Sequence, residues 1–411
     1  MADTTRVVVT GLGTINPLGL SIDEFWQSAV AGKSGIGQIT RFDTEKFFVK
    51  VAGEVKGFDA YSYMDPKMAD RNPRAVHYGL AAAREAMTMA GIEMDKEVRE
   101  RVGISVACMS ESDYVVRQAE ILAKRGPRRV DPLFVARSGP SGPSMQMGML
   151  FEARGPNTSV NSLCAAGADS LGTAMMFLKM GYADVMIAGG TDSCLSPVGM
   201  AGLDILGALT REPDAAKASR PFDANRSGFV FGEGAGIMVL ETLEHAQARG
   251  AEILAELAGA GWTFDAFDQT APAPEPESYA MKVAMQTAGV SPSEIQYVNA
   301  HETSTRLNDP TETKALKLAF GDHAYKLAIS STKSMTGHAI TAGGAIEAIS
   351  CVMSIRTGVV HPTINYETPD PECDLDYIPN TARQLPVRVA MTDSFGLGGE
   401  NCCLVFKKFE G

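Results

Sequence analysis

The sequence lacks clusters of basic residues and any long apolar run. Its 37 Lys and Arg residues are outnumbered by 49 Asp and Glu residues, which gives a formal net charge of −12. Nucleic-acid binding relies on Lys and Arg gathered against phosphates, so this charge balance argues against a nucleic-acid partner. No apolar run approaches the roughly 20 residues that a membrane-spanning helix needs. We therefore expect a cytoplasmic protein that binds neither nucleic acid nor membrane.

Cysteine is also scarce, and its seven residues include no Cys-x-x-Cys pair. An odd count without that spacing favours neither a disulfide framework nor a zinc cluster. With 411 residues, of which 45% are hydrophobic, the chain can bury a substantial core. Short β-rich runs alternate with helical patterns and no repeat is visible in the sequence. This alternation predicts an α/β fold.

The segment around Cys164 predicts a strand-to-helix junction. Residues 159–161 are extended in character, and after Cys164 apolar residues recur at helical spacing until Gly181. A thiol at a helix N-terminus feels the positive end of the helix dipole and free backbone N–H groups, and both favour the thiolate. Cys164 is therefore a candidate nucleophile. The alternative is a small buried core residue.

Two of the six histidines, His301 and His338, lie in loops rich in Gly, Ser and Thr. Loops at strand ends often carry catalytic groups, although a loop histidine can also be mere surface. Asp309, Pro310 and Glu312 predict the N-cap, N1 and N3 positions of the helix that follows His301. Metal binding by the two histidines would need a third ligand at suitable spacing, which the sequence does not offer. We therefore expect no metal.

Two glycine-rich segments have different interpretations. Residues 10–17 begin like a dinucleotide-binding fingerprint, but Asn16 replaces the third glycine and Pro17 follows, so we reject that reading. The segment Phe395–Gly399 joins two predicted strands. It would let a backbone N–H group approach a ligand, and a plain tight turn explains it equally well.

Four motifs resemble, in order, those of the β-ketoacyl-acyl carrier protein synthases of the Cys-His-His, KAS II type, within the thiolase superfamily. They are Asn161-Ser-Leu-Cys164, Asn299-Ala-His301-Glu-Thr-Ser-Thr305, Lys333-Ser-Met-Thr-Gly-His338 and Asp393-Ser-Phe-Gly-Leu-Gly-Gly399. The resemblance implies the thiolase fold, with five layers α-β-α-β-α built from two similar halves. Residues 1–255 would carry the nucleophile, and residues 256–411 the two histidines.

The resemblance also implies a reaction, a decarboxylative Claisen condensation with malonyl-acyl carrier protein that elongates a fatty acyl chain. Cys164 would hold the acyl group as a thioester, while His301 and His338 would hydrogen-bond the malonyl carbonyl where enolate charge develops. The backbone N–H groups of Cys164 and Leu397 would form the oxyanion hole. Lys333 would orient the site by pairing with Glu347, with Glu312 as a further supporting carboxylate.

Substrates would arrive on the phosphopantetheine arm of acyl carrier protein, with no other cofactor. Thr270, Thr303, Thr305 and Phe395 are the residues implied to contact the substrate. Because the carrier and this chain are both acidic, docking needs a local basic patch. The resemblance implies that this patch consists of Lys67, Arg71, Arg74, Arg128 and Arg129, although scattered solubilising charge is the alternative. It also implies a homodimer.

Several positions depart from the family pattern. Glu302 replaces a glycine, Glu400 replaces a threonine, Leu397 replaces a gating phenylalanine, and Ser110 with Glu111 replaces part of a glycine-rich stretch at the base of the acyl pocket. Carboxylates at positions 302 and 400 should repel anionic malonyl unless a cation such as Arg306 neutralises them. We therefore expect an altered acyl substrate or gating motion with the core reaction retained.

These departures keep a second interpretation open, a type II polyketide or aryl polyene ketosynthase that acts with a chain-length-factor partner. A thiolase is disfavoured because the segment Phe395–Gly399 contains no second cysteine. A non-catalytic chain-length subunit is disfavoured because it would lack Cys164.

Overall fold

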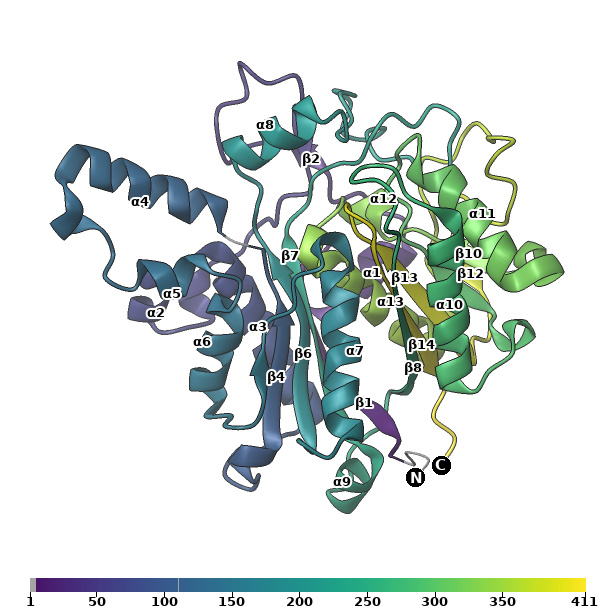
Figure 1. The fold of residues 1–411 in the computed structure, drawn as a ribbon, viewed down its shortest axis with the longest axis horizontal. Coiled ribbons are helices and arrows are strands. Elements are labelled where there is room, and N and C mark those ends of the chain that lie inside the picture. The colour runs from purple at the N-terminus through teal and green to yellow at the C-terminus, as the bar shows by residue number, and fades with distance from the viewer. Residues whose placement is uncertain (1–4, 110) are drawn as a thin grey trace.

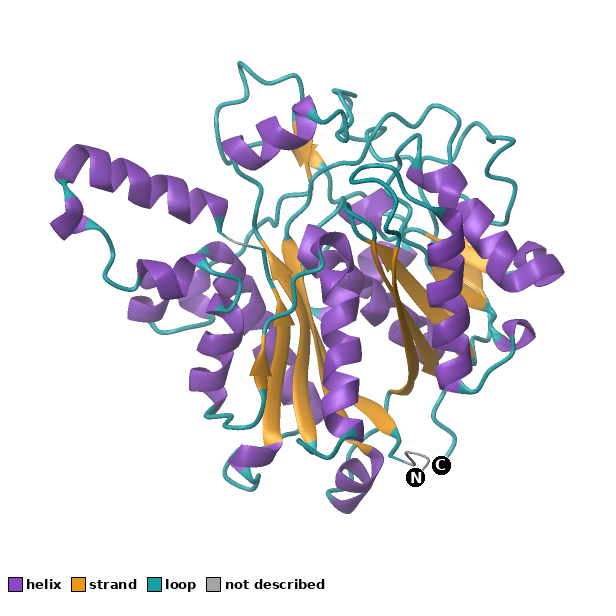
Figure 2. Ribbon diagram, viewed as in Figure 1, coloured by secondary structure: helices purple, strands orange, loops and turns teal. Residues whose placement is uncertain are grey.

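The computed structural model describes residues 5–109 and 111–411. In these ranges ten strands form one mixed sheet, which helices flank and divide (Figures 1 and 2). The strands are β1 (Val7–Ile15), β4 (Val102–Ala107), β5 (Asn157–Thr158), β6 (Val185–Asp192), β7 (Gly234–Thr242), β8 (Ala255–Phe264), β9 (Tyr297–Asn299), β10 (Ala328–Ser330), β13 (Val389–Phe395) and β14 (Glu400–Lys407). Two small ribbons pair β2 (Gly37–Gln38) with β3 (Val51–Ala52) and β11 (Val359–Val360) with β12 (Arg383–Gln384).

The α-helices differ widely in length. They are α1 (Ile22–Val30), α2 (Pro66–Arg71), α3 (Arg74–Ala90), α4 (Ser112–Arg125), α5 (Phe134–Ser138), α6 (Gly142–Phe151), α7 (Ala166–Lys179), α8 (Pro197–Ile205), α9 (Leu243–Ala248), α10 (Pro274–Ala288), α11 (Asn308–Phe320), α12 (Lys333–Thr336) and α13 (Gly343–Thr357).

The large sheet consists of two halves with the same strand order. The first half runs β1-β7-β6-β4-β5 and the second runs β8-β14-β13-β9-β10. The halves join where Val8 lies opposite Glu256 and Val9 lies opposite Ala255. Because each strand of the first half has a counterpart in the second, two similar halves exist in the fold although no repeat is visible in the sequence.

Helices form three layers around these two half-sheets. Helices α3 and α6 pack on the outer face of the first half, and α10, with α11 beside it, packs on the outer face of the second. Helices α7 and α13 lie between the halves and contact strands of both. The predicted α/β thiolase fold, with its five layers α-β-α-β-α, is confirmed.

A glycine sets the close approach of each outer helix to its sheet. A Cβ atom on Gly11 would lie 2.1 Å from the carbonyl oxygen of Ala86 in α3. A Cβ atom on Gly261 would lie 2.2 Å from the carbonyl oxygen of Ala280 in α10. Both distances are far inside van der Waals contact, so only glycine permits this packing at either place. The two contacts correspond to each other in the two halves.

The helix after the His301 loop does not begin as predicted. Helix α11 begins at Asn308, so Asp309 lies inside it and is not its N-cap. The Asp309 carboxylate instead accepts the backbone N–H of Phe222 at 2.8 Å and that of Thr305 at 3.2 Å. These tertiary hydrogen bonds outweigh the local capping preference and tie the His301 loop to a distant segment.

Helix α4 stands away from the body of the molecule (Figure 1). Its buried side chains are Tyr114 and Gln118, whereas Val115, Val116 and Leu122 are exposed. Within the described ranges, none of the helices is both long and apolar enough to cross a membrane.

Candidate active site

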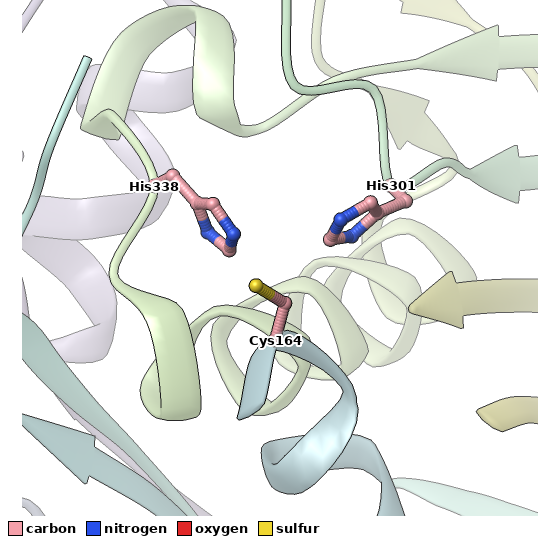
Figure 3. A group of neighbouring side chains, drawn as sticks. All are labelled: Cys164, His301 and His338. Carbon is pink, nitrogen blue, oxygen red and sulfur yellow. The ribbon is translucent and has the colours of Figure 1, made fainter. Parts of the chain in front are cut away.

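Three side chains from separate segments meet at the ends of α7 and α12. Cys164 lies in a 3₁₀ turn, Leu163–Ala165, directly before α7. His301 follows β9, and His338 follows α12. The Cys164 sulfur and one nitrogen of each imidazole all lie within 4.8 Å of one another. Figure 3 shows both rings pointing toward the sulfur. The structure therefore brings together the thiol and the two imidazoles that the sequence singled out.

These groups line a cavity of about 480 Å³. Other residues expected to bind substrate share its wall, namely Thr270, Thr303, Thr305, Phe395 and Leu397. The Thr303 and Thr305 hydroxyl oxygens lie 3.0 Å apart, and the Thr270 hydroxyl donates to Asp268 at 2.9 Å. The cavity thus brings the Cys164 thiol together with several hydroxyl groups that can hydrogen-bond a substrate.

The thiol of Cys164 is less acidic than its position suggested. Burial raises the pKa of Cys164 to about 11, although a hydrogen bond from the Leu397 backbone N–H and the charge of Lys333 act in the opposite direction. Desolvation therefore outweighs the helix-terminus effect that the sequence favoured. The resting nucleophile is a thiol, and its proton must be taken by a neighbouring base.

Both imidazoles are neutral in this environment. Burial and the charge of Lys333 lower the pKa of His301 and of His338 well below the usual value. The Lys333 ammonium group lies 3.3 Å from Nδ1 of His301. Since lysine can only donate, Nδ1 is the acceptor and the ring proton sits on Nε2. Phe395 holds the His301 ring edge-on at 5.9 Å, and Phe229 holds that of His338 at 5.2 Å.

A buried ion pair and two carboxylates hold this arrangement in place. Lys333 pairs with Glu347, and both side chains are almost fully buried. The His301 backbone N–H donates to Glu312 at 2.7 Å and to Asp393 at 2.8 Å. Glu347 and Glu312 thus lie where supporting groups were expected. Asp393 belongs to a motif that the sequence analysis recognised, but nothing in the pattern revealed that it anchors His301.

The folded chain places a third possible metal-ligand atom beside the two histidines, although the sequence offers none at metal-binding spacing. Cys164, though distant in sequence, supplies a third donor atom within 4.8 Å of the imidazoles. However, the Lys333 ammonium group sits 3.3 Å from His301 and would repel a divalent cation. A thiol with two neutral imidazoles suits nucleophilic and hydrogen-bonding chemistry better than metal binding.

Glu302 does not line the cavity. Its side chain is fully buried, and neither carboxyl oxygen has a hydrogen-bond partner among the described residues. Burial, reinforced by Glu312, Asp309 and Asp393, raises the pKa of Glu302 well above its usual value. This shift disfavours the charged form of Glu302 and so weakens the electrostatic repulsion of malonyl expected from it.

The other departures have separate positions. Leu397 is partly exposed and lines the cavity. Glu400 does not line the cavity, and one of its carboxyl oxygens is buried next to Gly396 and Gly398. Glu111 accepts the Ala75 backbone N–H at 3.0 Å and lines a second cavity of about 210 Å³. Its pKa is raised to about 7, mainly by burial. Ser110 lies outside the described residues.

None of the five basic residues assigned to carrier docking lines the main cavity. Lys67 and Arg71 lie on α2, and Arg128 and Arg129 lie in the 3₁₀ turn Pro127–Arg129 after α4. The side chain of Arg74 is 30% exposed, and its Nε lies 3.8 Å from Glu233. Arg74 is thus partly committed to an internal carboxylate.

Comparison with known proteins decides the family. The family model "Beta-ketoacyl synthase, N-terminal domain" matches residues 4–246, and "Beta-ketoacyl synthase, C-terminal domain" matches residues 254–367. The chain belongs to the β-ketoacyl synthase family. The resemblance stated from the four motifs is therefore confirmed.

Relatives of this β-ketoacyl synthase include fatty-acid and polyketide proteins. The 3-oxoacyl-[acyl-carrier-protein] synthase 2 of Staphylococcus aureus (strain COL) is 45% identical over 416 residues, covering 100% of both chains. The ishigamide ketosynthase/chain length factor structure has a TM-score of 0.92 at 36% identity, covering 99% of this chain and 100% of that one. A ketosynthase in complex with its type II PKS acyl-carrier protein, AntDE:AntF, has a TM-score of 0.90 at 34% identity with the same coverage.

Replacing Glu302 by glycine should give a more stable protein than replacing it by alanine. The φ angle of Glu302 is +30°, a region that glycine adopts without strain. Both variants remove the unpaired carboxyl and leave similar space, so they differ mainly in this strain. We expect the free energy of unfolding of Glu302→Gly to exceed that of Glu302→Ala by about 1 kcal/mol in urea denaturation. The opposite order would contradict the strained backbone.

Breaking the buried ion pair should cost both stability and activity. Lys333→Met leaves the Glu347 carboxylate without its cation, which should lower the free energy of unfolding by about 3–5 kcal/mol. The double variant Lys333→Met with Glu347→Leu should regain most of that stability. Condensation should remain slow, because His301 still lacks the donor that fixes its tautomer. A double variant with the normal condensation rate would refute this role of Lys333.

Alkylation of Cys164 by iodoacetamide should accelerate throughout the alkaline range. With a thiol pKa of about 11, the reactive thiolate fraction rises about tenfold per pH unit up to that value. Peptide mass spectrometry after timed labelling would give the rate at each pH. The other six thiols are buried, so Cys164→Ser should abolish early labelling. A rate that levels off near pH 8 would show that the thiol is acidic.

Proposed function

We propose that this chain catalyses the decarboxylative condensation of an acyl thioester with malonyl-acyl carrier protein to give 3-oxoacyl-acyl carrier protein in fatty-acid elongation. The observation that carries this proposal is the set formed by one thiol and two neutral imidazoles within 4.8 Å in a substrate-sized cavity. Each half-reaction uses a different part of this set.

In the first half-reaction, Cys164 takes the acyl group from its carrier. An imidazole accepts the thiol proton, and the sulfur attacks the thioester carbonyl. The Leu397 N–H, which hydrogen-bonds the resting thiol, lies ready to stabilise the oxyanion together with the Cys164 N–H. The carrier thiolate leaves and receives the proton back from the imidazole. Protons therefore balance, and the site returns to neutral imidazoles.

In the second half-reaction, the malonyl group loses carbon dioxide. Electrons of the breaking C–C bond move into the thioester carbonyl, whose oxygen becomes negative. Nε2–H of His301 and an N–H of His338 donate to this oxygen, and the nearby Lys333 charge stabilises it further. The enolate carbon attacks the acyl carbonyl on Cys164, the acyl–sulfur bond breaks, and the released Cys164 thiolate takes up a proton from water, so that the step consumes one proton overall. Neutral imidazoles suit this step because, unlike an imidazolium, they do not transfer a proton to the carboxylate of the substrate.

The substrate is proposed to reach Cys164 on a phosphopantetheine arm, with no separate cofactor. The hydroxyls of Thr270, Thr303 and Thr305 on the cavity wall would hydrogen-bond the arm. The basic residues of α2 and the turn after α4 would attract the acidic carrier. The AntDE:AntF complex, in which a ketosynthase holds an acyl-carrier protein, supports this partner class.

We further propose a homodimer in the cytoplasm, with the two halves of each chain divided at residue 255. The exposed apolar residues of the projecting helix α4 need a covering partner, and a second copy of the chain would supply one. Residue 255 is the first residue of β8, where the second half-sheet starts.

Polyketide synthesis with a chain-length-factor partner is the second candidate. It is favoured by the 36% identity and TM-score of 0.92 to the ishigamide ketosynthase/chain length factor. Leu397 at the gating position is a smaller cavity-wall residue than phenylalanine and would leave more room beside Cys164.

The acyl group found on Cys164 would test both functions. We expect incubation with a mixture of acyl-carrier proteins, without malonyl donor, to leave a saturated acyl thioester on the Cys164 peptide in intact-mass and peptide spectra. Adding malonyl-carrier should then release 3-oxoacyl-carrier and carbon dioxide in equal amounts. Cys164→Ala should lose the acyl adduct. An adduct made only from polyenoyl or poly-β-keto carriers would favour the second candidate, and no adduct from any carrier would overturn the proposal.

A further inference from the structure

The imidazole of His338 has no hydrogen bond that fixes its ring. Neither ring nitrogen has a partner among the described residues, whereas Nδ1 of His301 accepts from Lys333 at 3.3 Å. The ring of His338 packs edge-on against Phe229, with 5.2 Å between the ring centroids. The place of the His338 ring therefore depends on how the backbone that carries it is held.

That backbone is tied to the first half of the chain before a strained turn. The His338 N–H donates to the Val230 carbonyl at 2.7 Å, and the His338 carbonyl accepts the Gly232 N–H at 2.9 Å. The chain then enters the 3₁₀ turn Ile340–Ala342, in which Ile340 has a φ angle of +44°. A β-branched residue rarely adopts a positive φ, and such strain persists only where the surroundings hold it in place.

A buried carboxyl group of the first half holds this turn. Asp192, the last residue of β6, is fully buried. One of its oxygens accepts the Thr341 hydroxyl at 2.7 Å and the Thr341 backbone N–H at 3.3 Å. The other oxygen accepts the Cys194 N–H at 2.7 Å, which fixes the orientation of the carboxyl group. The Thr191 carbonyl oxygen lies farther from the same hydroxyl, at 3.1 Å.

Two glycines bring Thr341 between the sheet and the helix of the nucleophile. A Cβ atom on Gly190 of β6 would lie 2.1 Å from the Thr341 carbonyl oxygen, and one on Gly167 of α7 would lie 2.8 Å from it. Gly167 comes three residues after Cys164, so the turn after His338 packs directly on the first turn of α7. The separation of the His338 ring and the Cys164 sulfur is therefore set across this contact.

We propose that Asp192 and Thr341 form a clamp between the two halves that positions the His338 imidazole for the malonyl step. Neither residue lines the cavity, so both act through His338 and are positioning residues. Without the clamp the strained turn can relax, and the N–H of the His338 ring moves out of line with the oxygen on which enolate charge develops. Donors aimed at developing charge lose much of their effect when they are misplaced.

The clamp should matter for one of the two half-reactions. Transfer of the acyl group to Cys164 needs one imidazole to accept the thiol proton, and His301, which Lys333 orients, can do so without His338. The malonyl step uses both imidazoles as donors to one oxygen and so depends on the position of each. This inference rests on the proposed function, since the malonyl step is part of it.

Separate measurement of the two half-reactions in the full chain would test the clamp. Mass spectrometry would follow acylation of Cys164 from an acyl-carrier protein, and carbon dioxide release from malonyl-carrier by the acylated protein would follow the second step. Thr341→Val keeps the shape of the side chain and removes the hydroxyl. We expect it to slow carbon dioxide release about 10- to 100-fold and to change acylation by less than about threefold. Thr341→Ser, which keeps the hydroxyl, should stay within about threefold in both steps.

A double variant tests whether Thr341 acts through His338. In a His338→Ala background, Thr341→Val should cause no further loss of carbon dioxide release, because no ring remains to be positioned. The matched control is Thr10→Val, which removes the hydroxyl of another buried threonine that donates to a buried carboxylate, that of Glu241. This control should leave both half-reactions within about threefold.

Three results would overturn the clamp: equal loss of both half-reactions in Thr341→Val, no loss of either, or a further loss of about tenfold in the double variant. If Thr341→Val does not fold, Thr341→Ala has the same expected result, and Thr341→Ser still decides, since a change beyond about tenfold in the ratio of its two rates would contradict the clamp. Failure of the unmodified protein to release carbon dioxide from malonyl-carrier would count instead against the proposed function.

Discussion

One buried ammonium group sets the charge state of the whole site. Lys333 is held by Glu347 on one side and donates to Nδ1 of His301 on the other. Its charge lowers the pKa of both imidazoles and partly offsets the burial that raises the pKa of Cys164. A buried cation is costly unless it is paired and hydrogen-bonded, and here both conditions are met. Together with burial, this cation keeps the histidines neutral as hydrogen-bond donors, and it brings the thiol closer to ionisation.

The fold makes this arrangement possible because the catalytic groups come from both halves. Cys164 stands at the start of α7, and Lys333 and His338 stand on and after α12 of the other half. Helices α7 and α13 share the central layer, where each contacts strands of both half-sheets. Packing in that layer therefore fixes the distance between nucleophile and imidazoles. A shift of one half against the other would separate them.

The sequence predicted the parts of the fold and site that depend on local pattern. Cys164 lies directly before a helix as its apolar spacing indicated, and the motif resemblance gave the five-layer architecture correctly. It could not give the acidity of the thiol, since burial, the Leu397 backbone N–H and a lysine 169 positions away together decide that quantity. It misplaced Asp309 because the partners that recruit this carboxylate, Phe222 and Thr305, are set by tertiary structure. Asp393 was missed for the same reason.

Burial disfavours the charged form of two acids close to the site, Glu302 and Glu277, and so reduces the need for a counter-cation beside them. Arg306 is exposed at the cavity wall, whereas Glu302 and Glu277 are fully buried, so Arg306 is not the group that neutralises them. Burial raises the pKa of both carboxyl groups, and Glu312 reinforces both shifts, which disfavours their charged forms. An uncharged acid is a hydrogen-bond donor, which a carboxylate is not. Glu302, a departure from the family pattern, therefore adds little negative charge beside the site, and the positive charge of Lys333 is left to act on the malonyl group.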